Sequence, residues 1–215
     1  MAQEPKPTII YIFDPICGWC YTFNPVIEHL HARYKHKVDF VVVSGGMITG
    51  KRMRPISEMS EFILSGYKDM ENLTGAHFGE KYLKMVETGT EMLDSEKPSF
   101  ALTAFKTILP EKVVAFAHLL QKAHFEKGQS YHNDSTYVEL ARSFNINEKL
   151  FIEKMNSDSI KIATHLDFKK TEESGISSFP TMLLQINGKV TLLAEGFNQK
   201  EYFEKKMDKM LKSGR

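Results

Sequence analysis

The sequence predicts an α/β fold in which a small central mixed sheet is interrupted by a large all-helical insertion. Residues 8–43 follow a strand, helix, strand pattern, and strands return near residue 181, while helical periodicity fills the segment between them. We therefore predict a sheet-containing domain made of residues 1–54 and 175–215, and an inserted helical domain made of residues 55–174. A chain of 215 residues is long enough for one core domain that carries such an insertion.

The opening strand, helix, strand unit is predicted from its β-branched runs. Residues 8–13, TIIYIF, are β-branched and aromatic and end at an Asp-Pro dipeptide, which favours a buried strand. A helix is expected from Gly18 onward, with a kink at Pro25 because proline lacks a backbone N–H. Residues 38–43, VDFVVV, are too β-branched to prefer a helix. The two strands are expected to be parallel, since a helix connects them.

Helical spacing dominates the insertion, and strand patterns return after it. Apolar residues recur at helical spacing, as at Val113, Phe116, Ala117 and Leu120. Residues 181–186 and 190–194 read as two strands, and the Asn-Gly dipeptide between them is typical of a type I′ hairpin turn. An amphipathic helix is expected over residues 198–211.

The composition is not that of a membrane-spanning protein or of a strongly basic protein. No apolar run approaches the roughly 18 residues of a membrane span, so we expect no membrane partner. Lys plus Arg (28) nearly balances Asp plus Glu (27), so no nucleic-acid partner is expected. We interpret the cluster Lys51, Arg52 and Arg54 as a solvated loop. The N-terminal segment lacks the features of a secretory signal, which predicts a cytoplasmic location where thiols are kept reduced.

Both cysteines of the chain, Cys17 and Cys20, lie where the first strand gives way to a helix. Three interpretations compete: a redox pair, half of a metal site, or two inert buried thiols. At the first turn of a helix, Cys17 would face unpaired backbone N–H groups and the positive end of the helix dipole, which stabilise a thiolate. One turn further on, Cys20 would reach the Cys17 sulfur and resolve a mixed disulfide. Redox chemistry is the favoured interpretation.

The metal interpretation needs two more ligands. The chain has no other cysteine, and the nearest histidines, His29, His31 and His36, are expected to point away from the start of the helix. We therefore predict no metal site, with zinc and inert thiols kept as alternatives.

Four short segments, spread over nearly the full chain, match the motifs of a known family in their order: DPICGWCY (14–21), SGGM (44–47), Pro98-Ser99 and GISSFPT (175–181). Together they resemble the thioredoxin superfamily and, more narrowly, the DsbA family and its cytoplasmic FrnE-like branch. The resemblance implies a thioredoxin-like fold with an inserted helical domain. It also implies a redox-active cysteine pair that faces a cis-proline.

The resemblance implies a role for each matching residue. Cys17 corresponds to the family's nucleophile, Cys20 to its resolving thiol and Pro180 to its cis-proline. The segment around that proline would present backbone groups to an extended substrate peptide, which makes Phe179 and Thr181 candidate substrate-binding residues.

Two residues near the cysteines have two interpretations each. Trp19 is a candidate substrate contact by its position, or it packs against the helical insertion. Asp14 is a candidate base for proton transfer, or a turn residue that caps the helix. The Gly-Trp dipeptide between the cysteines differs from the Pro-His and Gly-Pro dipeptides of better-known relatives.

The predicted activity is that of a thiol-disulfide oxidoreductase or protein-disulfide isomerase. Protein or small-molecule thiols and disulfides would be its partners, with no cofactor beyond the redox-active disulfide, or with glutathione or another thiol as co-substrate. One alternative is a non-catalytic adapter whose cysteines sense oxidants. The other is a glutathione-dependent isomerase or transferase of the hydroxychromene-carboxylate isomerase type, which characteristically carries Ser at the nucleophile position.

Overall fold

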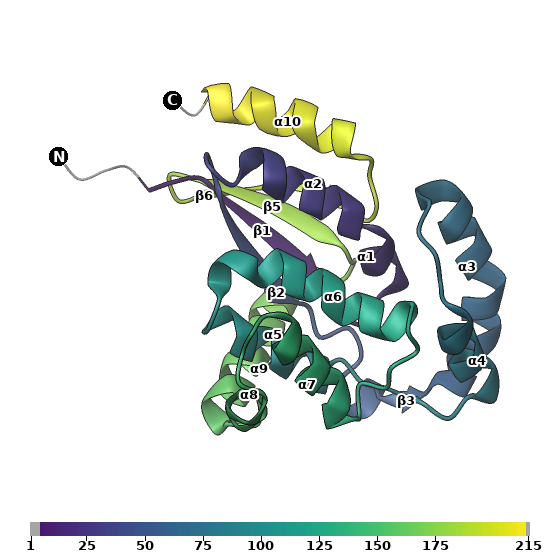
Figure 1. Ribbon diagram of the computed structural model, residues 1–215. Coiled ribbons are helices and arrows are strands. Elements are labelled where there is room, and N and C mark those ends of the chain that lie inside the picture. The colour runs from purple at the N-terminus through teal and green to yellow at the C-terminus, as the bar shows by residue number, and fades with distance from the viewer. Residues whose placement is uncertain (1–4, 214–215) are drawn as a thin grey trace.

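The computed structural model describes residues 5–213 and has a four-stranded mixed sheet at its centre (Figure 1). The strands are β1 (Thr8–Phe13), β2 (Asp39–Ser44), β5 (Thr181–Ile186) and β6 (Lys189–Glu195), in the order β2-β1-β5-β6. β1 and β2 are parallel, in register from Thr8 with Asp39. β5 is antiparallel to both β1 and β6. The predicted α/β fold with a mixed sheet is confirmed.

The first helix of the prediction is divided in two. α1 (Gly18–Thr22) ends at Phe23, and α2 (Asn24–Tyr34) begins directly after it. Pro25 lies in the first turn of α2, where a backbone N–H has no partner within the helix in any case. The expected kink is therefore a break, because proline suits the start of a new helix better than the middle of one.

The hairpin turn follows the prediction. Asn187 and Gly188 connect β5 to β6 with φ angles of 49° and 78°. These are the positive φ angles that a type I′ turn requires at both central positions.

The insertion between β2 and β5 is mainly helical. Its helices are α3 (Ser60–Thr74), α4 (Glu80–Thr88), α5 (Glu96–Lys106), α6 (Val113–Phe125), α7 (Asp134–Ser143), α8 (Glu148–Met155) and α9 (Asp158–Glu173). Short 3-10 turns cover Gly50–Arg52, Ile56–Met59 and Pro110–Lys112.

The insertion also contains a small antiparallel sheet that the sequence did not predict. β3 (Arg54–Pro55) pairs with β4 (Met92–Leu93). Strands of two residues are too short to show alternation in a sequence, so periodicity gives no signal for them. Arg54 therefore lies in a strand, not in the solvated loop that we expected.

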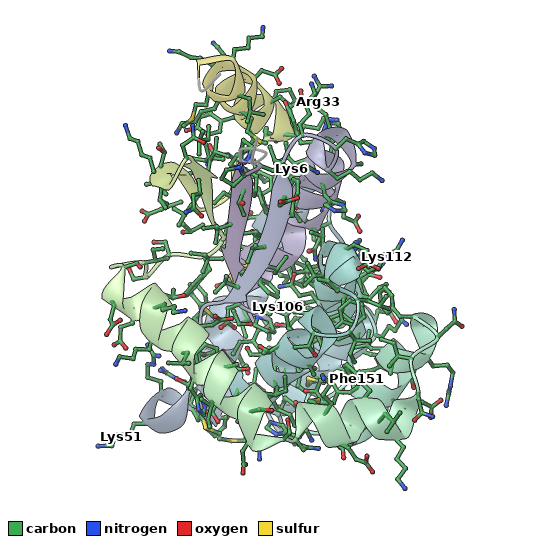
Figure 2. All side chains as sticks on the ribbon, turned by 90° about the vertical axis from the view of Figure 1, so that its left-hand side faces the viewer. Lys6, Arg33, Lys51, Lys106, Lys112 and Phe151 are labelled. Atoms are coloured by element: carbon green, nitrogen blue, oxygen red, sulfur yellow. The ribbon has the colours of Figure 1, made fainter. Side chains whose placement is uncertain are left out.

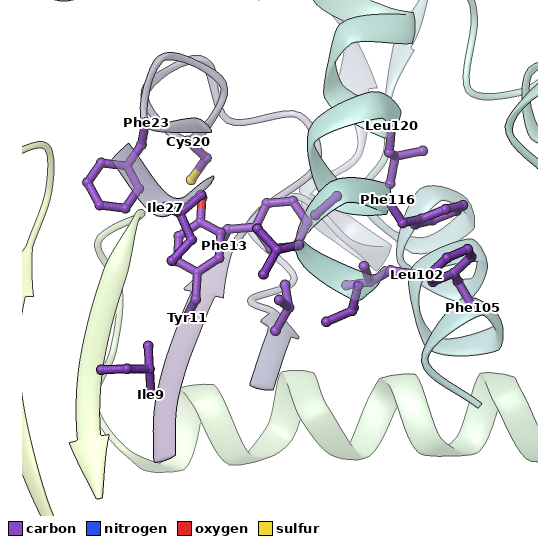
Figure 3. Close-up of a cluster of buried hydrophobic side chains, with 14 of the residues drawn as sticks. Ile9, Tyr11, Phe13, Cys20, Phe23, Ile27, Leu102, Phe105, Phe116 and Leu120 are labelled. Atoms are coloured by element: carbon purple, nitrogen blue, oxygen red, sulfur yellow. The ribbon is translucent and has the colours of Figure 1, made fainter. Parts of the chain in front are cut away.

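Helices α5 to α9 of the insertion share one hydrophobic core with the sheet. Buried side chains of β1 and α2 belong to the same cluster as those of α5, α6 and α8. Figure 3 shows Phe13 of β1 on the side of Leu120 and Phe116 of α6. Phe151 of α8, labelled in Figure 2, is fully buried, with its ring 6.0 Å from that of Phe116. These helices are thus anchored against the sheet by a continuous apolar interior, while α3 and α4 pack in a second cluster around Phe78.

The C-terminal helix α10 (Lys200–Ser213) lies against α2 (Figure 1). The Phe203 ring packs edge-on against Phe23 at 5.5 Å, and Tyr34 donates a hydrogen bond of 2.7 Å to Asp208. α10 thereby supports the helix that leads away from the cysteine pair. Among residues 5–213, no helix is long and apolar enough to cross a membrane.

Candidate active site

The cysteine pair lies at the start of α1. Cys17 is the N-cap residue of this helix, and its sulfur accepts a hydrogen bond of 3.3 Å from the Cys20 backbone N–H. Both thiols are free, Cys17 is 7% exposed and Cys20 is completely buried. One sulfur is therefore close to the surface and the other is shielded.

Pro180 lies beside the cysteines, because β5 runs antiparallel to β1. The Phe179-Pro180 peptide bond is cis. The Cys17 thiol donates to the Phe179 carbonyl oxygen at a sulfur–oxygen distance of 3.7 Å, across 162 positions of sequence. The fold thus brings together Cys17, Cys20 and Pro180, which sequence motifs had singled out separately.

The Phe179 side chain lies against the loop that follows β2. A Cβ atom added to Gly45 would lie 2.0 Å from Cε1 of Phe179, so only glycine leaves room for this ring. Next to it, Gly46 has a φ of +68° and lies against Phe168 of α9. The two glycines of the SGGM segment therefore allow the proline loop and α9 to pack closely on the end of β2.

Asp14 is a buried carboxylate that connects three segments. Its Oδ1 accepts hydrogen bonds from the Ile16 backbone N–H (3.1 Å) and the Ser95 hydroxyl (2.9 Å). Its Oδ2 accepts from the Met47 backbone N–H at 2.7 Å. Burial raises the pKa of Asp14 from 3.8 to about 6, because these hydrogen bonds only partly offset the loss of water. Asp14 is thus a turn residue, but it does not cap the helix as that interpretation expected, because Cys17 is the N-cap of α1.

Cys20 lies in an environment that favours its neutral thiol. Burial raises the pKa of Cys20 well above its ordinary value, and the neighbouring Cys17 and the Asp14 charge raise it further. A hydrogen bond from the Asp14 backbone acts in the opposite direction. The protonated thiol is therefore the favoured form of Cys20.

Gln121 is a site residue that sequence reasoning missed. Its amide Nε2 donates to the Asp14 carbonyl at 3.1 Å and to the Cys17 carbonyl at 3.5 Å, while its Oε1 accepts from Asn24 at 2.9 Å. The side chain is completely buried. Gln121 follows Leu120 on the apolar face of α6. A polar residue on an otherwise apolar helix face was the sequence feature that could have identified it.

Trp19 and Thr181 lie where the fold gives them different roles. Trp19 is 39% exposed, and its ring lies 6.2 Å from that of Phe197, which follows β6. One face of the Trp19 ring therefore packs on the sheet-containing domain, and its role as a substrate contact stays a prediction. The Thr181 side chain is fully buried and donates to the Ser178 carbonyl at 2.7 Å. This hydroxyl thus links the start of β5 to the proline loop, and the role of Thr181 in substrate binding stays a prediction.

Within residues 5–213, no group of three His, Cys, Asp or Glu side chains is arranged to hold a metal ion. His29, one of the histidines we considered as ligands, instead contacts Glu204 of α10 at 2.7 Å.

Comparison with known protein families agrees with this geometry. The family described as Thioredoxin matches residues 11–205. The chain belongs to the thioredoxin family.

Two solved structures show which variant of the thioredoxin fold this is. A candidate protein disulfide isomerase from Nitrosomonas europaea is 26% identical, with a TM-score of 0.85 over 97% of this chain and 98% of the other. The cytosolic disulfide reductase DsbM from Pseudomonas aeruginosa is 23% identical, with a TM-score of 0.79 over 95% of this chain and 98% of the other. DsbM has also been solved with GSH. The thioredoxin fold of this chain is thus of the DsbA type with a helical insertion.

A different kind of relative matches by sequence. The ClpXP adapter protein SpxH from Halalkalibacterium halodurans is 24% identical over 196 residues, which cover 84% of this chain and 60% of SpxH. The thioredoxin-family chain described here therefore spans about 60% of the length of this curated relative.

We predict that Gly45→Ala displaces the proline loop. The added methyl overlaps the Phe179 ring, and overpacking of this kind lowers the free energy of unfolding by about 1–3 kcal/mol. The displaced Phe179 carbonyl would also release the Cys17 thiol, so alkylation of Cys17 by iodoacetamide should become several-fold faster. Gly66→Ala is the matched control, since nothing lies within 4 Å of its Cβ. Equal behaviour of the two variants would refute the packing role of Gly45.

A second prediction concerns Asp14→Asn and the pH dependence of stability. Because the folded-state pKa of Asp14 is raised, its carboxyl contributes most stability below about pH 4, and this contribution is lost as pH rises through about 6. Asn does not titrate. Between pH 4 and 7.5, the unfolding free energy of the wild type should therefore fall by about 2 kcal/mol relative to that of the variant. Denaturant unfolding at several pH values measures this difference, and a difference that stays constant with pH would contradict the buried-carboxylate account.

Proposed function

We propose that this protein is a thiol-disulfide oxidoreductase that works through a mixed disulfide, with Cys17 as nucleophile and Cys20 as resolving thiol. One observation carries the proposal: the Cys17 sulfur lies between the Cys20 backbone N–H and the Phe179 carbonyl, while the Cys20 sulfur is buried behind it. This geometry favours attack by Cys17 on a substrate disulfide at the surface, and attack by the buried Cys20 on the Cys17 sulfur of the mixed disulfide.

In the reducing direction, the Cys17 thiolate attacks one sulfur of a substrate disulfide. A bond forms between Cys17 and that sulfur, the substrate S–S bond breaks, and the leaving thiolate takes up a proton. Cys20 then loses its proton and attacks the Cys17 sulfur. The Cys17–Cys20 disulfide forms, the second substrate thiol leaves, and two electrons have passed to the substrate. The same steps in reverse oxidise a substrate dithiol.

Asp14 is our candidate acceptor for the Cys20 proton. Its charge lies close enough to raise the pKa of Cys20, and its own pKa of about 6 leaves it mostly ionised at pH 7. A buried base with a pKa near the working pH is suited to proton transfer. Its three hydrogen bonds fix the carboxylate in place beside the cysteine loop.

Substrates are proposed to bind along the proline loop and Trp19. The Phe179 carbonyl already accepts a hydrogen bond from Cys17, and the exposed Trp19 ring offers an apolar contact beside it. Protein or small-molecule disulfides fit this open edge. Glutathione or another thiol is a proposed co-substrate, which is supported by the DsbM structure with GSH, and the cytoplasm is the proposed location.

An adapter function is the second candidate. It is favoured by the sequence match to SpxH, which covers most of this chain but only 60% of that protein. In an adapter, the cysteine pair would report oxidants instead of turning over substrate. Serine at both cysteine positions would then leave partner binding unchanged.

A disulfide-reduction assay, with insulin as substrate and dithiothreitol as reductant, distinguishes the oxidoreductase function from the adapter function. We expect wild-type turnover and at least a hundredfold loss in both Cys17→Ser and Cys20→Ser. The Cys20→Ser variant should also accumulate a mixed disulfide at Cys17, visible by mass spectrometry, because the resolving thiol is missing.

The serine variants also supply the control. Circular dichroism should show both folded, since each change replaces one sulfur by oxygen. Turnover that survives in Cys17→Ser would rule out the proposed nucleophile. If the wild type shows no turnover, and the double serine variant keeps its binding partners, the adapter function is favoured.

A further inference from the structure

The hydroxyl of Tyr11 is buried and has no hydrogen-bond partner in the part of the chain that the structure describes. A buried hydroxyl left unpaired destabilises a protein, because it has given up its hydrogen bonds to water. Phe would fill the same space in β1 without this cost. The presence of the hydroxyl is therefore not explained by the stability of the fold.

Three other buried tyrosines form the hydrogen bonds that buried hydroxyls usually form. Tyr34 donates to Asp208, Tyr131 to the Leu120 carbonyl at 2.9 Å, and Tyr137 to the Tyr131 carbonyl at 2.6 Å. Tyr11 is an exception in the same interior. Its ring is well packed, with centroids 5.4 Å from Phe13 and 5.7 Å from Phe23, so loose packing does not explain the unpaired oxygen.

Tyr11 lies next to Cys20 (Figure 3). It projects from β1 toward the face covered by α1 and α2, and Figure 3 shows its ring directed at Cys20. Burial raises the pKa of Tyr11 well above its ordinary value, and the charges of Cys20 and then Cys17 raise it further. Both sulfurs are thus within electrostatic reach, and the hydroxyl keeps its proton and is available as a donor.

We propose that the Tyr11 hydroxyl donates a hydrogen bond to the Cys20 sulfur when Cys20 becomes a thiolate during resolution of the mixed disulfide. A thiol is a weak acceptor, whereas a thiolate is a strong one, so the partner of the hydroxyl exists only during the reaction. This role rests on the proposed oxidoreductase function. Tyr11 gives up no proton; the Cys20 proton goes to Asp14 or to water, and the Cys20 electron pair forms the bond to Cys17.

The titratable groups that act on Cys20 in the described structure come from three places. Tyr11 lies on β1, Asp14 at the end of that strand, and Cys17 at the start of α1. Asp14 and Cys17 raise the pKa of Cys20 through their charges. Tyr11 is neutral and can lower it by hydrogen bonding. Its removal should therefore shift the pH profile of Cys20 upward.

The test uses the reduced protein and 5,5′-dithiobis(2-nitrobenzoate), which releases a coloured thiolate in two phases. The first phase reports attack by Cys17, and the second reports attack by Cys20 on the mixed disulfide. In Tyr11→Phe we expect the second phase to slow about tenfold, the size of one charge-assisted hydrogen bond, with its pH midpoint about one pH unit higher. The first phase should change much less. Tyr34→Phe is the matched control, because it removes a hydroxyl at the far end of α2.

The free energy of unfolding distinguishes a role of Tyr11 in the reaction from a role in stabilising the fold. Tyr11→Phe should unfold at the same or a higher denaturant concentration than the wild type, because it removes an unpaired polar group. A second phase of unchanged rate and midpoint would overturn the proposal. If Tyr11→Phe does not fold, Tyr11 is replaced by 3-fluorotyrosine instead. Its more acidic phenol should lower the pH midpoint of the second phase, and an unchanged midpoint would overturn the proposal. If the wild type itself shows no second phase, the oxidoreductase function fails instead.

Discussion

The buried carboxylate of Asp14 is the interaction on which the geometry of the site depends. It accepts hydrogen bonds from Ile16 in the cysteine loop, from Met47 after β2, and from Ser95 before α5. A charge in an apolar interior must be hydrogen-bonded, so these three segments are held in fixed relative positions. Gln121 adds a fourth connection, from α6 to the backbone of the same loop. The inserted helices thus help to build the site.

The same arrangement gives the two sulfurs different properties. Cys17 is reached from the surface and receives a backbone hydrogen bond, while Cys20 is buried beside a carboxylate that favours its thiol form. Thiol-disulfide exchange needs this asymmetry, because one thiol must react with substrates and the other must wait for the mixed disulfide. The relatives include both a disulfide reductase and a protease adapter, so the same asymmetry is compatible with turnover or with oxidant sensing.

Local patterns were enough to predict the sheet and its hairpin. The strands at residues 8–13 and 181–186 were predicted with the observed boundaries, because β-branched runs and an Asn-Gly turn act over short distances. The contacts of Gly45 with Phe179 and of Gln121 with Asp14 join positions more than 100 residues apart. Such contacts depend on tertiary packing, which has no periodic signal in a sequence. The break at Phe23 and the β3–β4 pair were missed for a related reason, since each depends on only a few residues.

Cys17 and Cys20 are proposed to form one reversible two-electron couple. The most direct test equilibrates the protein in glutathione buffers from reducing to oxidising, traps free thiols by alkylation, and counts them by mass spectrometry. The account predicts that both thiols disappear together in a single transition, with a slope of about 30 mV per tenfold change in the equilibrium constant. Accumulation of a glutathione adduct on Cys17 while Cys20 stays free would contradict it, as would two free thiols in the most oxidising buffer.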